Sequence, residues 1–131
     1  MGDIRSFRDL EVWSAAMTLV ASAYQLIRKL PAAEMYGLSA QMRRAAVSIP
    51  SNIAEGHAGG RGARYRHHVR IALGSLAELD THLEIAVRLG FLSPPERATA
   101  AAQLTRTRQL LHGLARSLER EKAGPRPTAS W

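Results

Sequence analysis

Apolar residues recur every three or four positions along most of this chain, a spacing that predicts helices rather than strands. The first such run extends from residue 6 to about residue 30, where Pro31 ends it. Ser6 at its start is followed three residues later by Asp9, and this pair has the form of a capping box. We therefore predict a first helix from Ser6 to about Leu30.

This first segment carries two neighbouring apolar stripes. A surface helix of a small domain needs only one stripe to face the core, so two stripes predict a helix that is buried on two sides. One of these sides is expected to be a contact between subunits, which would make the protein a homo-oligomer. The first stripe is Leu10, Trp13, Met17, Val20, Tyr24 and Ile27, and the second is Val12, Ala16, Leu19, Ala23, Leu26 and Leu30.

The second segment begins at Ala33 or Leu38 and is interrupted by Pro50. A proline inside a helix removes one N–H donor and crowds the carbonyl four residues back, here that of Ala46. The apolar pattern resumes at Ile53, so we predict that the helix kinks at Pro50 and continues to Glu55. The polar side chains around the proline are expected to satisfy the backbone groups that the kink frees. They are Ser48, Ser51 and Asn52.

Two further helices follow a glycine-rich turn at residues 56–62. The third is predicted from Ala63 to Leu89, with Gly90 as its C-terminal cap. The fourth opens with the sequence Ser93-Pro94-Pro95-Glu96, a strong start signal, and continues to about Lys122. Four striped helices joined by short connections predict an all-α protein, an antiparallel up-down-up-down four-helix bundle with a proline kink in the second helix. Residues 1–122 would form this bundle and residues 123–131 a flexible tail.

The composition limits the environment and the partners of this domain. The 131 residues include no cysteine, no run of apolar residues long enough to span a membrane and no apolar leader, so we expect a cytoplasmic protein with no membrane partner. Eighteen basic residues against 11 acidic ones give a net charge of +7. This charge favours an anionic partner such as RNA or DNA. The alternative is that the charge only keeps the protein soluble.

A cluster of arginines at the start of the third helix is the main candidate binding site. Four arginines fall within ten residues that contain no acid, although cations near a helix N-terminus oppose the helix dipole. One interpretation is a patch that contacts phosphates, and the other is a solvated helix start. The cluster consists of Arg61, Arg64, Arg66 and Arg70. Arg43 and Arg44 are second candidates, which could instead pair with Glu55, Glu78 or Glu84 across the bundle.

Other kinds of chemistry find little support in the sequence. The turn Gly59-Gly60-Arg61-Gly62 is too short for a phosphate-binding loop and lacks the lysine that would follow it. A di-iron bundle needs two Glu-x-x-His pairs, whereas Glu78 and His82 are four residues apart and no second pair exists. We therefore expect no metal, no cofactor and no enzymatic activity.

Several motifs resemble one bacterial protein family, the four-helix-bundle proteins encoded in intervening sequences of large-subunit ribosomal RNA genes. The motifs cover about residues 7–120, and the longest is the most specific. They are residues 7–13 (FRDLEVW), 36–38 (YGL), 41–45 (QMRRA), 47–56 (VSIPSNIAEG) and 72–79 (ALGSLAEL). The turn after Gly56 departs from many relatives, because His57 and Ala58 are neither aromatic nor arginine.

The resemblance implies a four-helix bundle that assembles as a ring-shaped homopentamer. The family is similar to the accessory variability determinant proteins of diversity-generating retroelements, which implies nucleic acid and a reverse transcriptase as partners. Charge, stripes and resemblance together favour a non-enzymatic homo-oligomer that binds nucleic acid, mostly without sequence preference. The alternative is a scaffold that contacts only other proteins.

Overall fold

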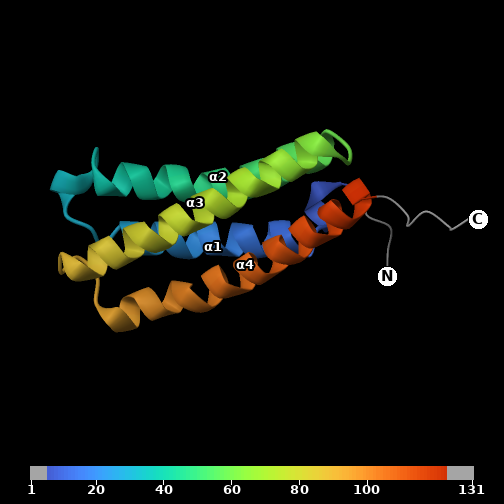
Figure 1. The fold of residues 1–131 in the computed structure, drawn as a ribbon. Coiled ribbons are helices and arrows are strands. Elements are labelled where there is room, and N and C mark those ends of the chain that lie inside the picture. Colours follow the sequence, from blue (N-terminus) through green and yellow to red (C-terminus); the bar gives the residue numbers. More distant parts are fainter. Residues whose placement is uncertain (1–5, 124–131) are drawn as a thin grey trace, which may run out of the picture.

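The computed structural model describes residues 6–123, and all regular secondary structure in this range is helical. The four main helices are α1 (Glu11–Ile27), α2 (Leu38–Ala58), α3 (Ala63–Arg88) and α4 (Pro94–Ala123). Two short 3-10 helices precede α1 and α2, namely η1 (Phe7–Asp9) and η2 (Ala32–Glu34). Figure 1 shows the chain reversing its direction at each of the three connections between long helices. The predicted all-α four-helix bundle is therefore confirmed, and the predicted tail lies almost entirely outside the described residues.

The start of the first helical segment differs from the prediction. The capping box is present, since the Ser6 backbone N–H donates to Asp9 Oδ2 at 3.1 Å and the Ser6 hydroxyl accepts from the Arg8 N–H at 3.2 Å. However, it caps the short helix η1, and Leu10 then takes an extended conformation before α1 begins. A capping box satisfies the first N–H groups of a 3-10 turn as well as those of an α-helix, so the sequence signal could not separate the two.

The start of α4 follows the prediction closely. The hydroxyl of Ser93 accepts from the Glu96 N–H at 3.2 Å, and Glu96 Oε1 accepts from the Ser93 N–H at 2.9 Å. Glu96 also pairs with Lys29, at 2.7 Å between Nζ and Oε2. The bonds from Lys29 and Ser93 lower the pKa of Glu96 to about 2. This carboxylate therefore ties the start of α4 to the end of α1.

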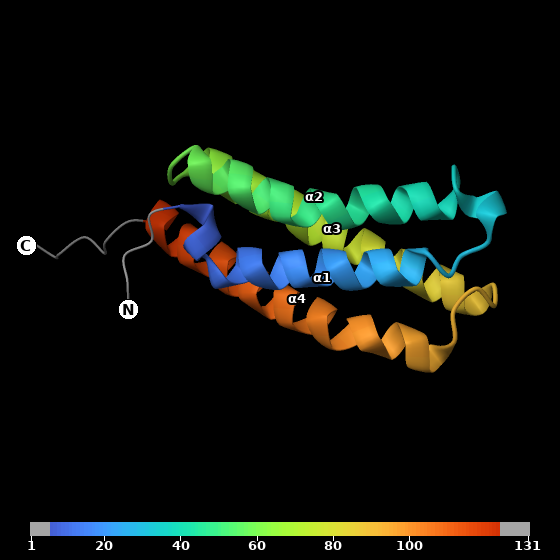
Figure 2. The ribbon, with the colours of Figure 1, turned by 180° about the vertical axis from the view of Figure 1, so that it is seen from behind.

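The four long helices form a square in which each packs against two others. Figures 1 and 2 show α3 between α2 and α4 on one side, and α1 between the same two helices on the other. One of the two stripes of α1 lies wholly in the core of this square. Of the other stripe, Ile27 is buried and Met17 is exposed, while the remaining four residues are half-buried at the edge of the core. The buried stripe is Val12, Ala16, Leu19, Ala23, Leu26 and Leu30.

Helix α2 continues through Pro50 to Ala58 without ending at the proline. Pro50 is itself buried, between the fully buried Ile49 and Ile53. Asn52 Nδ2 donates to the Ser48 carbonyl at 2.8 Å, so a polar neighbour of the proline does bind the backbone, although it is not the Ala46 carbonyl that Pro50 frees. The bend at Pro50 stays a prediction. Within residues 6–123, no helix is long and apolar enough to cross a membrane.

Candidate nucleic-acid interface and assembly surface

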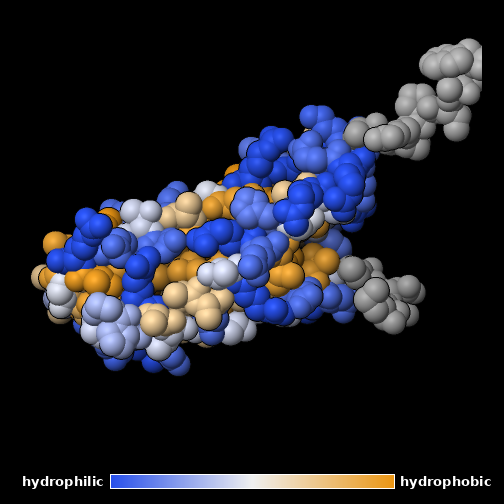
Figure 3. All heavy atoms as spheres, turned by 60° about the horizontal axis from the view of Figure 1, so that its bottom comes forward, coloured by the Kyte–Doolittle hydropathy of each residue, from blue (hydrophilic) through white to orange (hydrophobic). Residues whose placement is uncertain are grey.

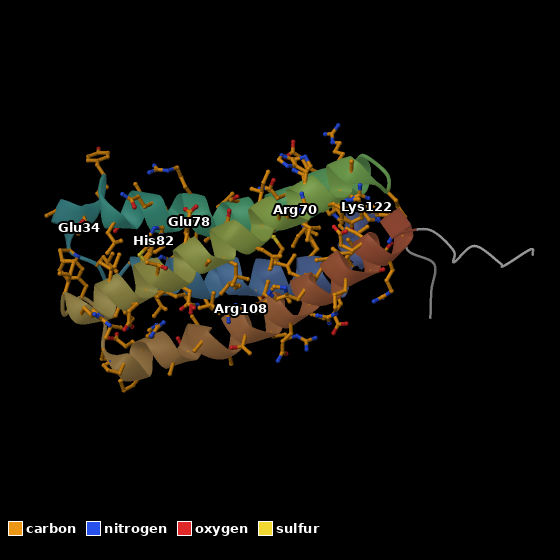
Figure 4. The ribbon with its side chains drawn as sticks, viewed as in Figure 1. Glu34, Arg70, Glu78, His82, Arg108 and Lys122 are labelled. Carbon is orange, nitrogen blue, oxygen red and sulfur yellow. The ribbon has the colours of Figure 1, made fainter. Side chains whose placement is uncertain are left out.

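The four arginines predicted at the start of α3 lie at one end of the bundle, but they are not equivalent. Figure 4 shows Arg70 of α3 and Lys122 of α4 toward this same end. Arg61 binds Glu121 of α4 with two contacts, from Nε at 2.7 Å and from Nη2 at 2.6 Å. This bond raises the pKa of Arg61 and lowers the pKa of Glu121. Arg70 Nη2 lies 3.5 Å from an oxygen of Glu119, also on α4. Two of the four arginines therefore pair with carboxylates of α4.

The other two arginines have no ion pair within residues 6–123. Arg64 is exposed, and its side chain lies along the turn, because a Cβ atom added at Gly59 would come within 2.8 Å of Arg64 Cδ. Arg66 is half-buried in the same first turn of α3, about 200° around the helix axis from Arg64. Their charges remain available for an anionic partner. The cluster predicted from sequence is therefore reduced to two unpaired arginines, Arg64 and Arg66, which lie on different faces of α3.

The carboxylates that neutralise Arg61 and Arg70 were missed by the sequence analysis, which examined only the residues around the turn. Glu119 and Glu121 lie near the end of α4, roughly 50 to 60 residues further along the chain. One signal could have found them. In an antiparallel bundle the end of the fourth helix lies beside the start of the third, and both carboxylates belong to that last part of α4.

The second pair of candidates lies elsewhere on the molecule. Arg43 Nη2 donates to the Met35 carbonyl at 2.9 Å, so it closes the turn before α2. Arg44 is exposed and has no ion pair among the described residues. The alternative of salt bridges across the bundle to Glu55, Glu78 or Glu84 finds no support in the structure. About 17 residues of α2 and the following turn separate Arg44 from Arg61, roughly 25 Å at 1.5 Å per residue, so the two groups do not form one patch.

A chain of hydrogen bonds between α2 and α3 was also missed. The hydroxyls of Ser48 and Ser75 are 2.8 Å apart, and Asn52 Nδ2 donates to Ser48 Oγ at 2.9 Å. Asn52 Oδ1 is 2.8 Å from Nδ1 of His68, so this histidine nitrogen is the donor. Glu55 Oε2 lies 3.8 Å from the same nitrogen. These groups fix the register of the two helices; no group of three His, Asp or Glu side chains within residues 6–123 is placed to hold a metal ion.

The first apolar stripe of α1, which contains Trp13, Met17 and Val20, remains partly exposed in the monomer. Met17 retains 43% of its accessible surface, and so does Val47 of α2. Together with Trp13, Val20 and Pro50 these residues line a groove between α1 and α2 with a volume of about 290 Å³. Figure 2 shows α1 and α2 side by side on this face. Contiguous exposed apolar surface of this kind marks an interaction site.

Comparison with known proteins agrees with the fold. A solved structure from Bacteroides thetaiotaomicron, described as a protein of unknown function from the S23 ribosomal protein family, superposes with a TM-score of 0.73 at 21% identity. The alignment covers 80% of this chain and 95% of that one. No curated protein matches the chain. The model of one family, described as 23S rRNA-intervening sequence protein, matches residues 8–113. The chain therefore belongs to the family of 23S rRNA-intervening sequence proteins.

Proposed function

We propose that this chain is a non-enzymatic, cytoplasmic homo-oligomer that binds nucleic acid through the arginines at the start of α3. The observation that carries the proposal is the pair Arg64 and Arg66, which have no ion pair within residues 6–123 while Arg61 and Arg70 beside them are held by carboxylates. Arginine is suited to this role because its planar guanidinium binds phosphate with two parallel hydrogen bonds. The net charge of +7 has the sign that such a partner requires.

The proposed assembly strengthens the weak contacts of a single subunit. Cyclic symmetry would repeat Arg64 and Arg66 around one rim, and the pentamer implied by the family would carry about ten unpaired arginines there. Several weak phosphate contacts on one particle act together as avidity. The exposed α1–α2 groove is the surface that we assign to the subunit contact. Light scattering should therefore detect an oligomer at micromolar concentration, and a monomer would contradict this part of the proposal.

The central experiment is a binding titration against short RNA and DNA at two salt concentrations. We expect the wild-type protein to bind at low salt and to weaken steeply at high salt, with a log–log slope of about −0.7 to −0.9 for each phosphate neutralised. Replacing Arg64 and Arg66 by alanine should weaken binding and flatten this slope. Replacing Arg61 and Arg70 by alanine should have a smaller effect, since Glu121 and Glu119 already neutralise them.

A matched control removes two unpaired charges that lie away from the start of α3. Arg28 follows α1 and Arg44 belongs to the first half of α2, both are exposed and without an ion pair within residues 6–123, and their double alanine variant changes the net charge by the same amount. If this control weakens binding as much as the Arg64 and Arg66 variant, the interface is not at the start of α3. Absence of binding by the wild type at low salt would favour the alternative, a scaffold that contacts only proteins.

A further inference from the structure

The large apolar side chains that face solvent are concentrated on two separate sides of the bundle. On the α1–α2 side, Met17 and Val47 line the exposed groove. On α3, Ile71 and Ile85 are 37% and 38% exposed, and Leu89 caps the end of the helix. Ile71 and Ile85 are 14 residues apart, close to four turns, so they share one outer stripe of α3. Within the described residues, α4 exposes no large apolar side chain.

A groove alone does not build a ring. In a cyclic assembly of more than two subunits each contact joins two different faces, because only a two-fold contact joins a face to itself. The α1–α2 groove therefore needs a different face on the next subunit. The outer stripe of α3 has a suitable position, since α3 lies diagonally across the square from α1 (Figures 1 and 2). The two faces are neither on the same side nor directly opposite, so successive contacts turn and can close a ring.

The two faces carry opposite charges. The groove continues past Val47 into a second hollow lined by Arg43 and Arg44, and no acid of the described residues lines either part. Arg44 is exposed and has no ion pair within residues 6–123. Glu78 follows Ile71 by seven residues and so lies on the outer stripe of α3. It also forms no ion pair in this range. Each face thus carries a free charge that the other could neutralise.

These two charges stand at nearly the same height along the bundle, whose long helices run roughly in one direction (Figure 1). The hydroxyls of Ser48 and Ser75 are 2.8 Å apart, which places these residues side by side on α2 and α3. Arg44 precedes Ser48 by four residues, about 6 Å at 1.5 Å per residue. Glu78 follows Ser75 by three residues, about 4.5 Å, and in the same direction because the helices are antiparallel. In a ring whose axis runs along the bundle, residues of equal height meet.

The apolar groups fit the same register. Ile71 lies four residues before Ser75, so it is level with the part of α2 that follows Ser48 by four residues. This part of α2 lines the groove through Ser51 and Ala54. A single alignment of two neighbouring subunits therefore places an apolar side chain against the apolar groove and a glutamate against an arginine.

We infer that the outer stripe of α3, formed by Ile71, Glu78 and Ile85, packs into the α1–α2 groove of a second copy of this chain, with Glu78 bound to Arg44 of that copy. The inference rests on the proposed homo-oligomer and makes it more specific, because it names both faces of the contact. A contact between two grooves would instead leave Arg44 without an acid, since no acid of the described residues lines the groove.

The experiment measures the mass of the full-length protein by light scattering over a dilution series without nucleic acid. Arg44→Glu and Glu78→Arg each bring like charges together, so each should raise the concentration of half-assembly by about tenfold or more. The double variant Arg44→Glu/Glu78→Arg restores an opposite pair and should return to within about threefold of the wild type. Arg44→Ala removes only an attraction and should shift this concentration by less than about fivefold. The alanine control at Arg28 and Arg44 therefore assembles nearly as the wild type does.

Matched variants test the charge and the apolar contact separately. Arg120→Glu on α4 makes the same charge change as Arg44→Glu at an exposed position without an ion pair within residues 6–123, and it should assemble like the wild type. Ile71→Gln should weaken assembly by about three- to tenfold, because it removes apolar surface from the contact. Ala77→Gln, about 120° around α3 from Ile71 and also exposed, should have no effect. Circular dichroism should show the same helix content in all variants.

The outcomes separate this inference from the proposed function. Unchanged assembly of both Arg44→Glu and Glu78→Arg would overturn the contact while leaving the homo-oligomer intact. A double variant as dissociated as the single ones would overturn it as well. Dissociation by Arg44→Glu alone, with no effect of Glu78→Arg, would replace it by a contact between two grooves. A monomeric wild type at micromolar concentration would remove the homo-oligomer and the inference together.

Discussion

Helix α3 has two neighbours in the bundle and contacts them through different chemistry. Toward α2 it presents small and polar groups that are shielded from water, including Ser75 and His68. Toward α4 it presents charged side chains that remain partly exposed, including Arg70 and Asp80. The same helix is thus held by shielded hydrogen bonds on one side and by partly exposed ion pairs on the other.

The α2 side is closely packed as well as hydrogen-bonded. Gly56 near the end of α2 lies directly against α3, where an added Cβ atom would come within 2.9 Å of the Tyr65 ring and 3.0 Å of His68 Cβ. A turn of α2 away, Asn52 bonds both Ser48 and His68. The glycine permits the close approach of the two helices, and this approach places the polar groups within bonding distance.

The α4 side is more open to solvent. Arg97 donates to Glu84 and Asp80, both at 2.7 Å, and Arg108 donates to Asp80 at 3.1 Å. These four side chains line an open cavity of about 540 Å³ between α3 and α4, and 31–40% of each side chain is exposed. Figure 3 shows hydrophobic surface between hydrophilic ridges when the molecule is turned to bring the lower edge of Figure 1 forward.

This difference has a consequence for stability. Exposed ion pairs contribute about 0–1 kcal/mol each and are weakened by salt, whereas breaking a buried hydrogen bond leaves an unsatisfied group that costs more. We therefore expect α2 and α3 to form the rigid half of the bundle and α4 to be the helix that separates first. Four predictions test this comparison, beginning with the largest effect.

Replacing Gly56 by alanine should destabilise the protein by about 1–3 kcal/mol. The added methyl group overlaps the buried Tyr65 ring, and such overpacking outweighs the better helix propensity of alanine. Gly74 in the middle of α3 is the matched control, because nothing lies within 4 Å of its Cβ position. Gly74→Ala should stabilise the helix by about 1 kcal/mol. Urea denaturation at one protein concentration measures both, and a loss of stability in both would show that packing against α3 is not the cause.

Replacing Asn52 by alanine should cost about 1–3 kcal/mol, because His68 Nδ1 loses its partner at 2.8 Å in a part-buried site. The control is Ser51→Ala, an exposed neighbour of the same proline that should change stability by less than about 0.5 kcal/mol. Added salt should change the difference between the two variants very little, since the Asn52 contacts involve no exposed ion pair. A difference that vanishes in salt would contradict the role assigned to the network.

Most of the fold could be predicted from the sequence, and the reasons are local. The start of α4 follows from Ser93 and Glu96, whose bonds lie within one turn, and the end of α3 follows from Gly90, which adopts a positive φ of 79°. The extended residue at Leu10 could not be foreseen, because the same capping residues serve both helix types. The stripes of α1 were also recognised, but periodicity alone does not say which stripe faces the core.

The candidate site was less predictable, because its electrostatics depend on residues far apart in the sequence. No acidic residue lies within five positions of Arg61 in the sequence, yet Glu121 pairs with it across the bundle. Likewise, the predicted backbone contact of Asn52 exists, while its bond to His68 depends on the exact rotation of α3 against α2. Local patterns determine where helices begin and end, and packing determines which side chains meet.

On the α4 side, replacing Asp80 by asparagine should cost about 1 kcal/mol or less at low salt. The variant removes the carboxylate shared by Arg97 and Arg108, but all three side chains are about one-third exposed, so water and salt screen the loss. The difference from the wild type should shrink further in high salt, in contrast to Asn52→Ala. In this variant the backbone amides of α4 should also exchange their hydrogens faster than those of α2. A salt-independent cost as large as that of Asn52→Ala would remove the distinction between the two sides.

Replacing His82 is expected to have the smallest effect on stability at neutral pH. This histidine has a buried nitrogen without a hydrogen-bond partner, and it is therefore a weak point of the α2–α3 contact. His82 lies seven residues, about two turns, after Ser75 and so on the same face of α3, but its Nδ1 is buried without a partner within residues 6–123. Figure 4 shows it next to Glu78 on this helix.

Burial lowers the pKa of His82 below its ordinary value of 6.5, and the charge of Glu78 only partly opposes this shift. A histidine with a lowered pKa in the folded state binds its proton more readily when the chain is unfolded. Its contribution to stability is therefore fully present above pH 6.5 and is lost as the pH falls from there toward the folded-state pKa. Replacing His82 by glutamine should flatten the stability profile between pH 7 and pH 5, measured by urea denaturation at fixed salt. The exposed His112 on α4 is the control, and His112→Gln should retain the wild-type slope. If both variants keep that slope, the acid sensitivity of the bundle comes from other groups, and the unpaired nitrogen of His82 is no weak point of the α2–α3 contact.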